Sequence, residues 1–218
     1  MIIIYYHICQ LGNWKEIVKE QLDLIQESKI PYHEIRIGFL GNVENIQPYL
    51  TEKIKLIYTS ENIKEYEIPT INKLVDYCKE TEENHQILYI HSKGAMSNAN
   101  NWRRLMNYWL IENWKMNINS LNDDYDTCGI LKMKDHYRGN FWWVNSHFIK
   151  FYKKKIPNSN NRCKAEFWLL RNKTTNHKCL LKPKISLKKL YNGFIENEYC
   201  YNDRQHNTNS EGFKTKNN

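Results

Sequence analysis

The chain has 218 residues, of which 41% are hydrophobic and 26% charged, and its formal net charge is +8. This length suits one α/β domain, and the composition excludes a low-complexity or largely disordered chain. No stretch approaches the roughly 18 apolar residues of a transmembrane helix, so we expect no membrane span. The positive charge indicates a polyanionic partner, such as phosphates, nucleic acid or an anionic membrane surface.

The cysteines and the N-terminal residues bear on the cellular location. No two of the six cysteines form a Cys-x-x-Cys pair, which disfavours a zinc ribbon or a thioredoxin-type motif. The chain begins directly with strand-like residues and shows neither the basic nor the long apolar region of a signal peptide. We therefore expect a reducing, cytoplasmic setting with free thiols.

The first 95 residues predict alternating strands and helices. Short apolar runs predict strands over residues 2–8, 33–39, 55–58 and 87–91. Apolar residues at helical spacing predict a helix over 14–28, with Asn13 and Glu16 forming a capping box. A second helix is expected to open at Pro69. This order predicts an α/β fold with a mainly parallel central sheet flanked by helices.

The rest of the chain gives weaker signals. Asn101 is expected to cap a helix with an apolar face, and residues 127–130 and 164–170 predict a strand and a short helix. From about Cys200 onward the sequence is polar and lacks periodicity. We expect a single domain over residues 1–200 and a flexible tail over 201–218.

The fourth predicted strand runs straight into His91, Ser92, Lys93 and Gly94. Ligands of open α/β sheets bind outside the carboxyl ends of the strands. A cation, a hydroxyl, an imidazole and a permissive glycine at such an end therefore predict an anion site. The alternative is that these polar residues simply face water.

Other strand ends extend this predicted site. We expect the ends of the first, third and fourth strands to converge near one edge of the sheet. The residues that they carry there, besides those of the fourth strand, are Tyr6, His7, Tyr58 and Ser60. Arg103, in the first turn of a predicted helix, could also reach a phosphate. A hydrogen-bonded role for His7 and a solvent-facing Arg103 are the structural alternatives.

Three blocks of the sequence together carry a resemblance to a known family. They are Leu88-Tyr89-Ile90-His91-Ser92-Lys93-Gly94, Gly139-Asn140-Phe141-Trp142-Trp143 and Ala165-Glu166-Phe167-Trp168. In order and spacing the chain resembles short GT-A-type glycosyltransferases of large DNA viruses and some bacteria, over roughly residues 1–170. The resemblance implies a GT-A-like fold, with a nucleotide-sugar-binding half at 1–95 and an acceptor-binding half at 96–200.

The resemblance also implies roles for individual residues. Glu166 matches the position where many such enzymes place an acidic residue that faces the acceptor, so it is the expected catalytic base. Its alternative role is to favour a helix start electrostatically. Sugars stack on aromatic rings, and adjacent strand residues face opposite sides of a sheet. We therefore expect at least one of a further group to contact the acceptor: His136, Asn140, Trp142 and Trp143.

One departure from the wider GT-A pattern concerns the metal. Those enzymes usually carry Asp-x-Asp after the fourth strand, where this chain has His91-Ser92-Lys93. Mn²⁺ or Mg²⁺ prefers carboxylate oxygens, and a lysine repels it. Either Lys93 neutralises the donor diphosphate itself or carboxylates from elsewhere hold the ion. The candidates for that second role are Asp123, Asp124, Asp126, Asp135 and, in the tail, His206.

The leading hypothesis is therefore a glycosyltransferase that moves a sugar from a nucleoside-diphosphate sugar, such as a UDP-sugar, to a hydroxyl of a glycan or protein. If the protein is viral, the expected location is the host cytoplasm. One alternative is an inactive nucleotide-sugar-binding module. Another is a basic nucleic-acid-binding protein, which is disfavoured because the sequence has no concentrated basic patch.

Overall fold

A run of β-branched and aromatic residues forms β1 (Ile2–Cys9), the strand around which the computed structural model is built. Every residue of β1 except the last is buried, as expected for a strand covered on both faces of a parallel sheet. The structure describes residues 1–95, 100–171 and 175–181. The predicted tail at 201–218, with His206, lies outside these residues.

The central sheet has seven strands in the order β3-β2-β1-β4-β6-β5-β7. β1 pairs in parallel with both β2 and β4, and β6 is antiparallel to its two neighbours, β4 and β5. The predicted α/β fold with a mainly parallel sheet is therefore confirmed. The remaining strands are β2 (Tyr32–Leu40), β3 (Ile54–Ser60), β4 (Gln86–His91), β5 (Thr127–Gly129), β6 (Trp142–Asn145) and β7 (His177–Cys179).

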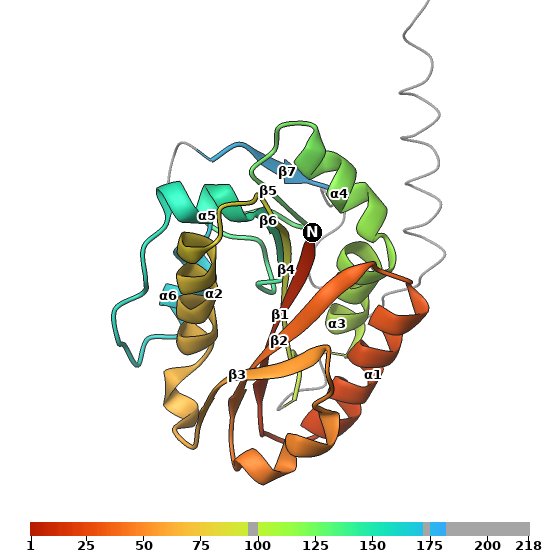
Figure 1. The fold of residues 1–218 in the computed structure, drawn as a ribbon, viewed down its shortest axis with the longest axis vertical. Helices are drawn as coiled ribbons and strands as arrows, with labels where there is room; N and C mark the ends of the chain where they lie inside the picture. Colours follow the sequence, from red (N-terminus) through yellow and green to blue (C-terminus); the bar gives the residue numbers. More distant parts are fainter. Residues whose placement is uncertain (96–99, 172–174, 182–218) are drawn as a thin grey trace, which may run out of the picture.

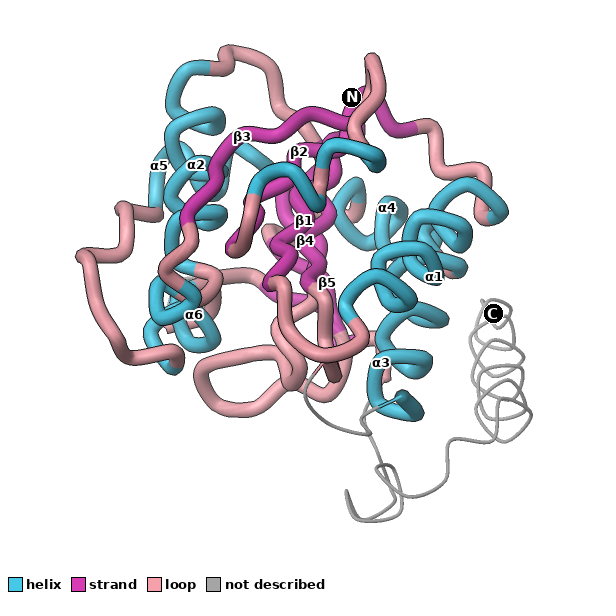
Figure 2. Tube along the Cα trace, turned by 90° about the horizontal axis from the view of Figure 1, so that it is seen from below, coloured by secondary structure: helices cyan, strands magenta, loops and turns pink. Residues whose placement is uncertain are grey.

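Helices cover both faces of the sheet (Figure 1). One layer holds α2 (Ile68–Glu80), α5 (Ser146–Tyr152) and α6 (Cys163–Trp168), and the other holds α1 (Trp14–Glu27), α3 (Asn100–Asn107) and α4 (Trp114–Asn122). Seen nearly end-on, the sheet separates these two layers (Figure 2). None of the helices in the described part of the chain has the length and hydropathy needed to cross a bilayer.

Alternation along the strands divides the core into two clusters. Tyr5 and Tyr89 point toward α2, whereas Ile4 and Tyr6 pack in the cluster that includes residues of α1 and α3. The tryptophan pair of β6 follows the same alternation. Trp142 packs with Tyr5 and Tyr89 on the α2 side, and Trp143 packs with Ile4 and Tyr6 on the α1 and α3 side. The candidate functional residues lie on the α2 face of the sheet.

Two predicted helix caps are wrong. Asn13 precedes α1 but makes no side-chain capping hydrogen bond, so the expected capping box does not form. Asn101 lies inside α3, which already begins at Asn100. A π-helical turn at Tyr108–Glu112 follows α3 and leads into α4. Three 3-10 turns complete the described elements, at Val43–Asn45, Gln47–Tyr49 and Ile63–Glu65.

Candidate active site

Two buried histidines lie at or near the carboxyl ends of the neighbouring strands β1 and β4. His7 and His91 are register partners across the parallel pair, and both side chains point toward the layer of α2. Nδ1 of His7 shares a 2.8 Å hydrogen bond with Oγ1 of Thr70 in α2. Nε2 of His91 lies 2.8 Å from the carbonyl oxygen of Gly139. Because a carbonyl only accepts, Nε2 of His91 carries the proton.

Burial holds both imidazoles in the neutral form. It lowers the pKa of His7 to about 3. The pKa of His91 lies well below its ordinary value, chiefly because of burial and secondly because of the positive charge of Lys93. The carboxylate of Glu67 does not form a hydrogen bond with His91, since its Oε1 is 3.9 Å from Nδ1. The two rings therefore act as polar, uncharged walls at neutral pH.

The turn after β4 presents its backbone and one cation at the carboxyl edge. Gly94 adopts a φ of +89°, a left-handed conformation that favours glycine. Oγ of Ser92 accepts a 3.1 Å hydrogen bond from the backbone N–H of Cys9, which ties this turn to the end of β1. Nη1 of Arg103 donates to the carbonyl of Lys93 at 3.1 Å. The turn is thus fixed from two sides.

Lys93 is the charged centre of the site. Burial lowers the pKa of its ammonium group, and the carboxylates of Glu166 and Glu67 act in the opposite direction. Arg162 is close enough to lower the same pKa further. Two cations and two carboxylates therefore lie close enough to influence one another's charge. They come from the turn after β4, the start of α2 and the start of α6.

The two carboxylates of the site differ in exposure. Glu67 directly precedes α2 and is only 7% exposed, and burial, the largest influence, raises the pKa of its carboxyl group. Glu166 lies in α6 with 23% of its side chain exposed, and its Oε1 is 3.5 Å from Nε of Arg162. Glu166 is therefore the carboxylate that an incoming molecule can reach.

The block from His136 to Trp142 reaches the same edge. The ring of His136 packs edge-on against Phe167 of α6, with 4.8 Å between ring centres. Burial lowers the pKa of His136, and the negative charge of Glu166 acts the other way. Asn140 accepts a hydrogen bond from Nε1 of Trp142 at 3.0 Å. Within the described residues, its amide nitrogen is buried without a partner.

Trp142 and Trp143 are core residues in this structure. Trp142 is 1% exposed and stacks on Tyr89 with 4.6 Å between ring centres. Trp143 is fully buried on the opposite face of the sheet, where its Nε1 donates to the carbonyl of Leu110. Neither ring offers a face to a sugar in this structure. Asn140 is also buried, so His136 is the most accessible member of the predicted acceptor group.

Several predicted donor residues lie away from this cluster. The ends of β1, β3 and β4 lie at the same edge because these strands run parallel, but β2 lies between β1 and β3 and separates Tyr58 and Ser60 from the cluster. Tyr6 is fully buried on the α1 side of the sheet, and its hydroxyl donates to Gln21. Arg103 is 4% exposed, and its guanidinium donates hydrogen bonds to Glu20, Asn100 and the Lys93 carbonyl. Its role here is to position the turn.

Two members of the cluster, Glu67 and Arg162, were not predicted from the sequence. Glu67 stands immediately before the Ile68-Pro69 helix start that follows the third strand, and such a position lies at the carboxyl edge of a parallel sheet. Arg162 is four residues before Glu166, the spacing of neighbours on one helix face. Both signals were present in the sequence, although neither is specific by itself.

Most of the carboxylates suggested as metal ligands lie at the amino edge of the sheet, opposite to the edge that carries Lys93. The carboxylate of Asp126 accepts a hydrogen bond from the backbone N–H of Asn176, and the backbone carbonyl of Asp124 accepts one from the Asn176 side-chain amide. Both lie just before β5, at the amino edge of the sheet, and Asp123 directly precedes them. They cannot share an ion with a diphosphate at Lys93. Asp135 is next to His136 and within its electrostatic reach. In the described parts of the chain, no group of three or more His, Cys, Asp or Glu side chains is placed to hold a metal ion.

The architecture is a Rossmann-like α/β fold with a charged cluster at the carboxyl edge of its parallel strands. The chain belongs to the family described as Domain of unknown function (DUF8361), whose model matches residues 5–177. No curated protein sequence matches it.

Solved structures show the same kind of fold. HddC from Yersinia pseudotuberculosis is similar with a TM-score of 0.50 and 11% identity, over 83% of this chain and 90% of that one. The 4-diphosphocytidyl-2C-methyl-D-erythritol synthase from Anaerococcus prevotii has a TM-score of 0.44 and 9% identity, over 94% and 98% of the two chains. Only the first likeness bears on the architecture, and it shows the fold alone.

Proposed function

We propose that the protein is a nucleotide-dependent transferase, and specifically a glycosyltransferase that uses a nucleoside-diphosphate sugar such as a UDP-sugar. The observation that carries this proposal is the position of Lys93. Its ammonium group lies at the carboxyl end of a central parallel strand, in electrostatic contact with Glu67, Glu166 and Arg162. Ligands of open α/β sheets bind at this edge, and the three sequence blocks that resemble glycosyltransferases meet here.

The donor diphosphate is assigned to Lys93 and its turn. A partly buried ammonium group binds a diphosphate more strongly than an exposed one does, because water competes less for the charge. Gly94 lets the backbone approach a phosphate closely because glycine has no side chain, and its left-handed φ favours glycine at this position. As the bond to the sugar breaks, negative charge grows on the leaving diphosphate, and Lys93 stabilises that charge more than it stabilises the bound donor.

The acceptor is assigned to Glu166. Its carboxylate is the more exposed of the two, so it can accept the proton of an acceptor hydroxyl as that oxygen attacks the sugar. Glu67 is buried and its negative charge acts on Lys93, although its carboxylate is too far from His91 for a hydrogen bond. Its role is to hold the cation in position.

We propose that cations of the chain neutralise the diphosphate in place of Mn²⁺ or Mg²⁺. The donor set does not suit a hard divalent ion, because Lys93 and Arg162 interact with the two carboxylates that would have to bind it. UDP binding that persists unchanged in excess EDTA would agree with this assignment. A requirement for Mn²⁺ would overturn it.

The proposal is tested first through Lys93→Ala. A charge-assisted contact contributes roughly 1.5–3 kcal/mol, so the affinity for UDP should fall by about ten-fold or more. Isothermal titration of UDP into the purified protein measures this, and the exposed Lys79 of α2 gives the matched control Lys79→Ala. If wild-type protein binds no nucleoside diphosphate at millimolar concentration, the donor site is wrong.

The second test separates chemistry from binding. Glu166→Gln keeps the size and hydrogen-bonding reach of the side chain but cannot take a proton. UDP affinity should survive, whereas sugar transfer should slow by on the order of 10²- to 10⁴-fold, the usual contribution of a general base. Unchanged transfer would remove Glu166 from the mechanism. Donor binding without any transfer or hydrolysis in the wild type would favour an inactive nucleotide-sugar-binding module.

A further inference from the structure

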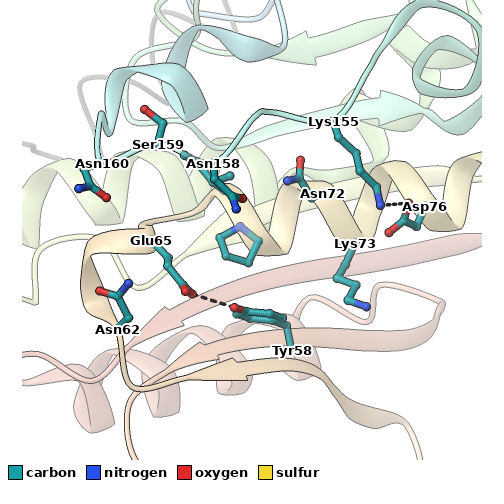
Figure 3. Close-up of a pocket in the computed structure, with 12 residues that line it drawn as sticks. Tyr58, Asn62, Glu65, Asn72, Lys73, Asp76, Lys155, Asn158, Ser159 and Asn160 are labelled. Atoms are coloured by element: carbon teal, nitrogen blue, oxygen red, sulfur yellow. Dashed lines mark hydrogen bonds and ion pairs between the residues drawn. The ribbon is translucent and has the colours of Figure 1, made fainter.

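A polar groove lies beside the charged cluster, on the other side of the first turn of α2. Its volume is about 510 Å³, and its walls come from β3, the turn before α2, α2 itself and residues 155–160 (Figure 3). The predicted donor residue Tyr58 lines this groove instead of the carboxyl-edge site. The proposed reaction of the previous section leaves the groove without a role.

The charges that line the groove cancel. Two lysines, Lys73 and Lys155, stand against two carboxylates, Glu65 and Asp76. Lys155 and Asp76 pair with each other at 2.7 Å, and Glu65 accepts a hydrogen bond from the hydroxyl of Tyr58 at 2.8 Å. A site with this balance gives no net attraction to a phosphate or another polyanion. This balance favours an electrically neutral ligand.

Uncharged polar side chains make up most of the remaining lining. Asn62, Asn158 and Asn160 each offer an amide that can both donate and accept hydrogen bonds. Pro69 and the ring of Tyr58 add apolar surface among these amides. Sugar rings have the matching chemistry, with hydroxyls that donate and accept around a ring whose C–H faces are apolar. A drug-like apolar ligand would instead need a mainly hydrophobic wall.

The groove is held open by a fixed contact between its two sides. The amide of Asn72 in α2 donates to the carbonyl of Ile156 at 2.9 Å and accepts from the N–H of Ile156 at 2.7 Å. This pair of hydrogen bonds fastens the start of the 155–160 segment to the helix. A preformed groove binds its ligand at a smaller entropic cost than one that must order first.

We propose that the groove binds a neutral glycan chain, which is the acceptor; this assignment rests on the proposed glycosyltransferase function. Ile68 and Pro69 line one end of the groove, and Glu67, which directly precedes them, faces Lys93 and His91. A chain of sugars lying along α2 would thus have its end beside the catalytic cluster, at the start of the same helix.

The test measures glycan binding separately from donor binding. Saturation-transfer NMR with a panel of neutral tri- and tetrasaccharides (glucan, mannan, galactan and N-acetylglucosamine oligomers) detects the first, and UDP titration detects the second. Asn158→Trp places an indole in the groove, and Asn119→Trp, an equally exposed site on α4, is the matched control. Asn158→Trp should weaken oligosaccharide binding at least ten-fold, whereas Asn119→Trp and Lys93→Ala should leave it unchanged.

The UDP titration gives the reverse pattern, with affinity lost in Lys93→Ala and kept in Asn158→Trp. Binding of no oligosaccharide of the panel, or binding that Asn158→Trp leaves intact, overturns the groove assignment. So does a loss of UDP affinity in Asn158→Trp, which would assign the groove to the nucleoside of the donor. UDP binding that fails in the wild type contradicts the proposed donor site, whatever the oligosaccharides do.

Discussion

At the scale of single residues, burial controls the charge of the site more than any one partner does. It is the largest influence on the pKa of His7, His91, Lys93 and Glu67 alike. A low-dielectric environment disfavours every charged form, so a cation persists here only where carboxylates face it, as at Lys93. The two histidines have no such partner within hydrogen-bonding distance and stay neutral.

This neutrality makes stability depend on pH in a defined direction. His7 has a folded-state pKa of about 3, against about 6.5 for an unfolded histidine. Below about pH 6.5 the unfolded chain binds a proton that the folded chain does not bind, so stability is complete above that pH and is lost as the pH falls toward 3. The slope contributed by His7 approaches about 1.4 kcal/mol per pH unit.

Urea unfolding at pH 6.0, 5.5, 5.0 and 4.5 should show a smaller slope of unfolding free energy against pH for His7→Asn than for the wild type. Equal slopes would contradict a neutral buried His7.

The sequence could specify some of these residues and not others. Lys93 directly follows a buried strand, so its position along the chain predicted that it lies at the carboxyl edge, whereas the place of Glu166 was implied by the resemblance to glycosyltransferases. Tyr6 and His7 are neighbours on one strand and must face opposite sides, but which of them faces the site depends on which helix layer carries it. That choice is made by contacts between residues far apart in sequence, such as His7 with Thr70.

At the scale of elements, a partly buried ion pair joins α1 to α3 and fixes the turn after β4. Nε and Nη2 of Arg103 donate to the two carboxylate oxygens of Glu20 at 3.1 and 2.7 Å. Asn107 adds a hydrogen bond to the same carboxylate at 3.1 Å. Nη1 of Arg103 donates to the carbonyl of Lys93 and to Oδ1 of Asn100. One guanidinium thus connects two helices with the loop that carries the proposed diphosphate ligand.

Removing Glu20 should lower the free energy of unfolding far more than removing one partner of an exposed ion pair on α1. Glu20→Ala leaves the guanidinium of Arg103, whose side chain is 5% exposed, without its carboxylate. We expect a loss of roughly 1.5–3 kcal/mol in the free energy of unfolding. The exposed pair Lys19–Asp23 on α1 gives the control, since Asp23→Ala removes a solvent-exposed ion pair and should cost much less than Glu20→Ala. Chemical denaturation measures both, and equal losses would contradict the role assigned to Arg103.

Element boundaries followed the sequence where apolar periodicity was strong. The predicted strand at 33–39 and helix at 14–28 match β2 and α1 to within about a residue. Caps failed because a capping hydrogen bond depends on local backbone angles, and Asn13 has a φ of −89° and a ψ of 37°. The π-helical turn at Tyr108–Glu112 could not be predicted, since its tryptophan and leucine also fit an ordinary helical period.

At the scale of the whole molecule, α2 joins the two functional regions to the sheet. Its first turn separates the charged cluster from the polar groove, and Thr70 fixes its distance from the strands. Thr70 bonds His7 on β1 and sits over Gly38, the register partner of His7 on β2. The strand order that places β2 beside β1 therefore also sets where the site lies, and this order could not be predicted from local patterns.

The close approach at Gly38 predicts a coupled response to mutation. A Cβ atom at this position would lie 2.0 Å from Oγ1 and 2.9 Å from Cβ of Thr70, so Gly38→Ala should push α2 outward and cost about 1–3 kcal/mol. Thr70→Ala alone leaves Nδ1 of His7 without its partner, at a cost of about 1–3 kcal/mol. In the double variant the removed hydroxyl makes room for the new methyl group, so its loss should be smaller than the sum by about 0.5–3 kcal/mol.

Gly129, which packs against Tyr137 instead, gives the control, because Gly129→Ala should combine additively with Thr70→Ala. Urea unfolding of the three single and two double variants decides the matter, and additive losses at Gly38 and Thr70 would mean that the helix does not rest on this contact.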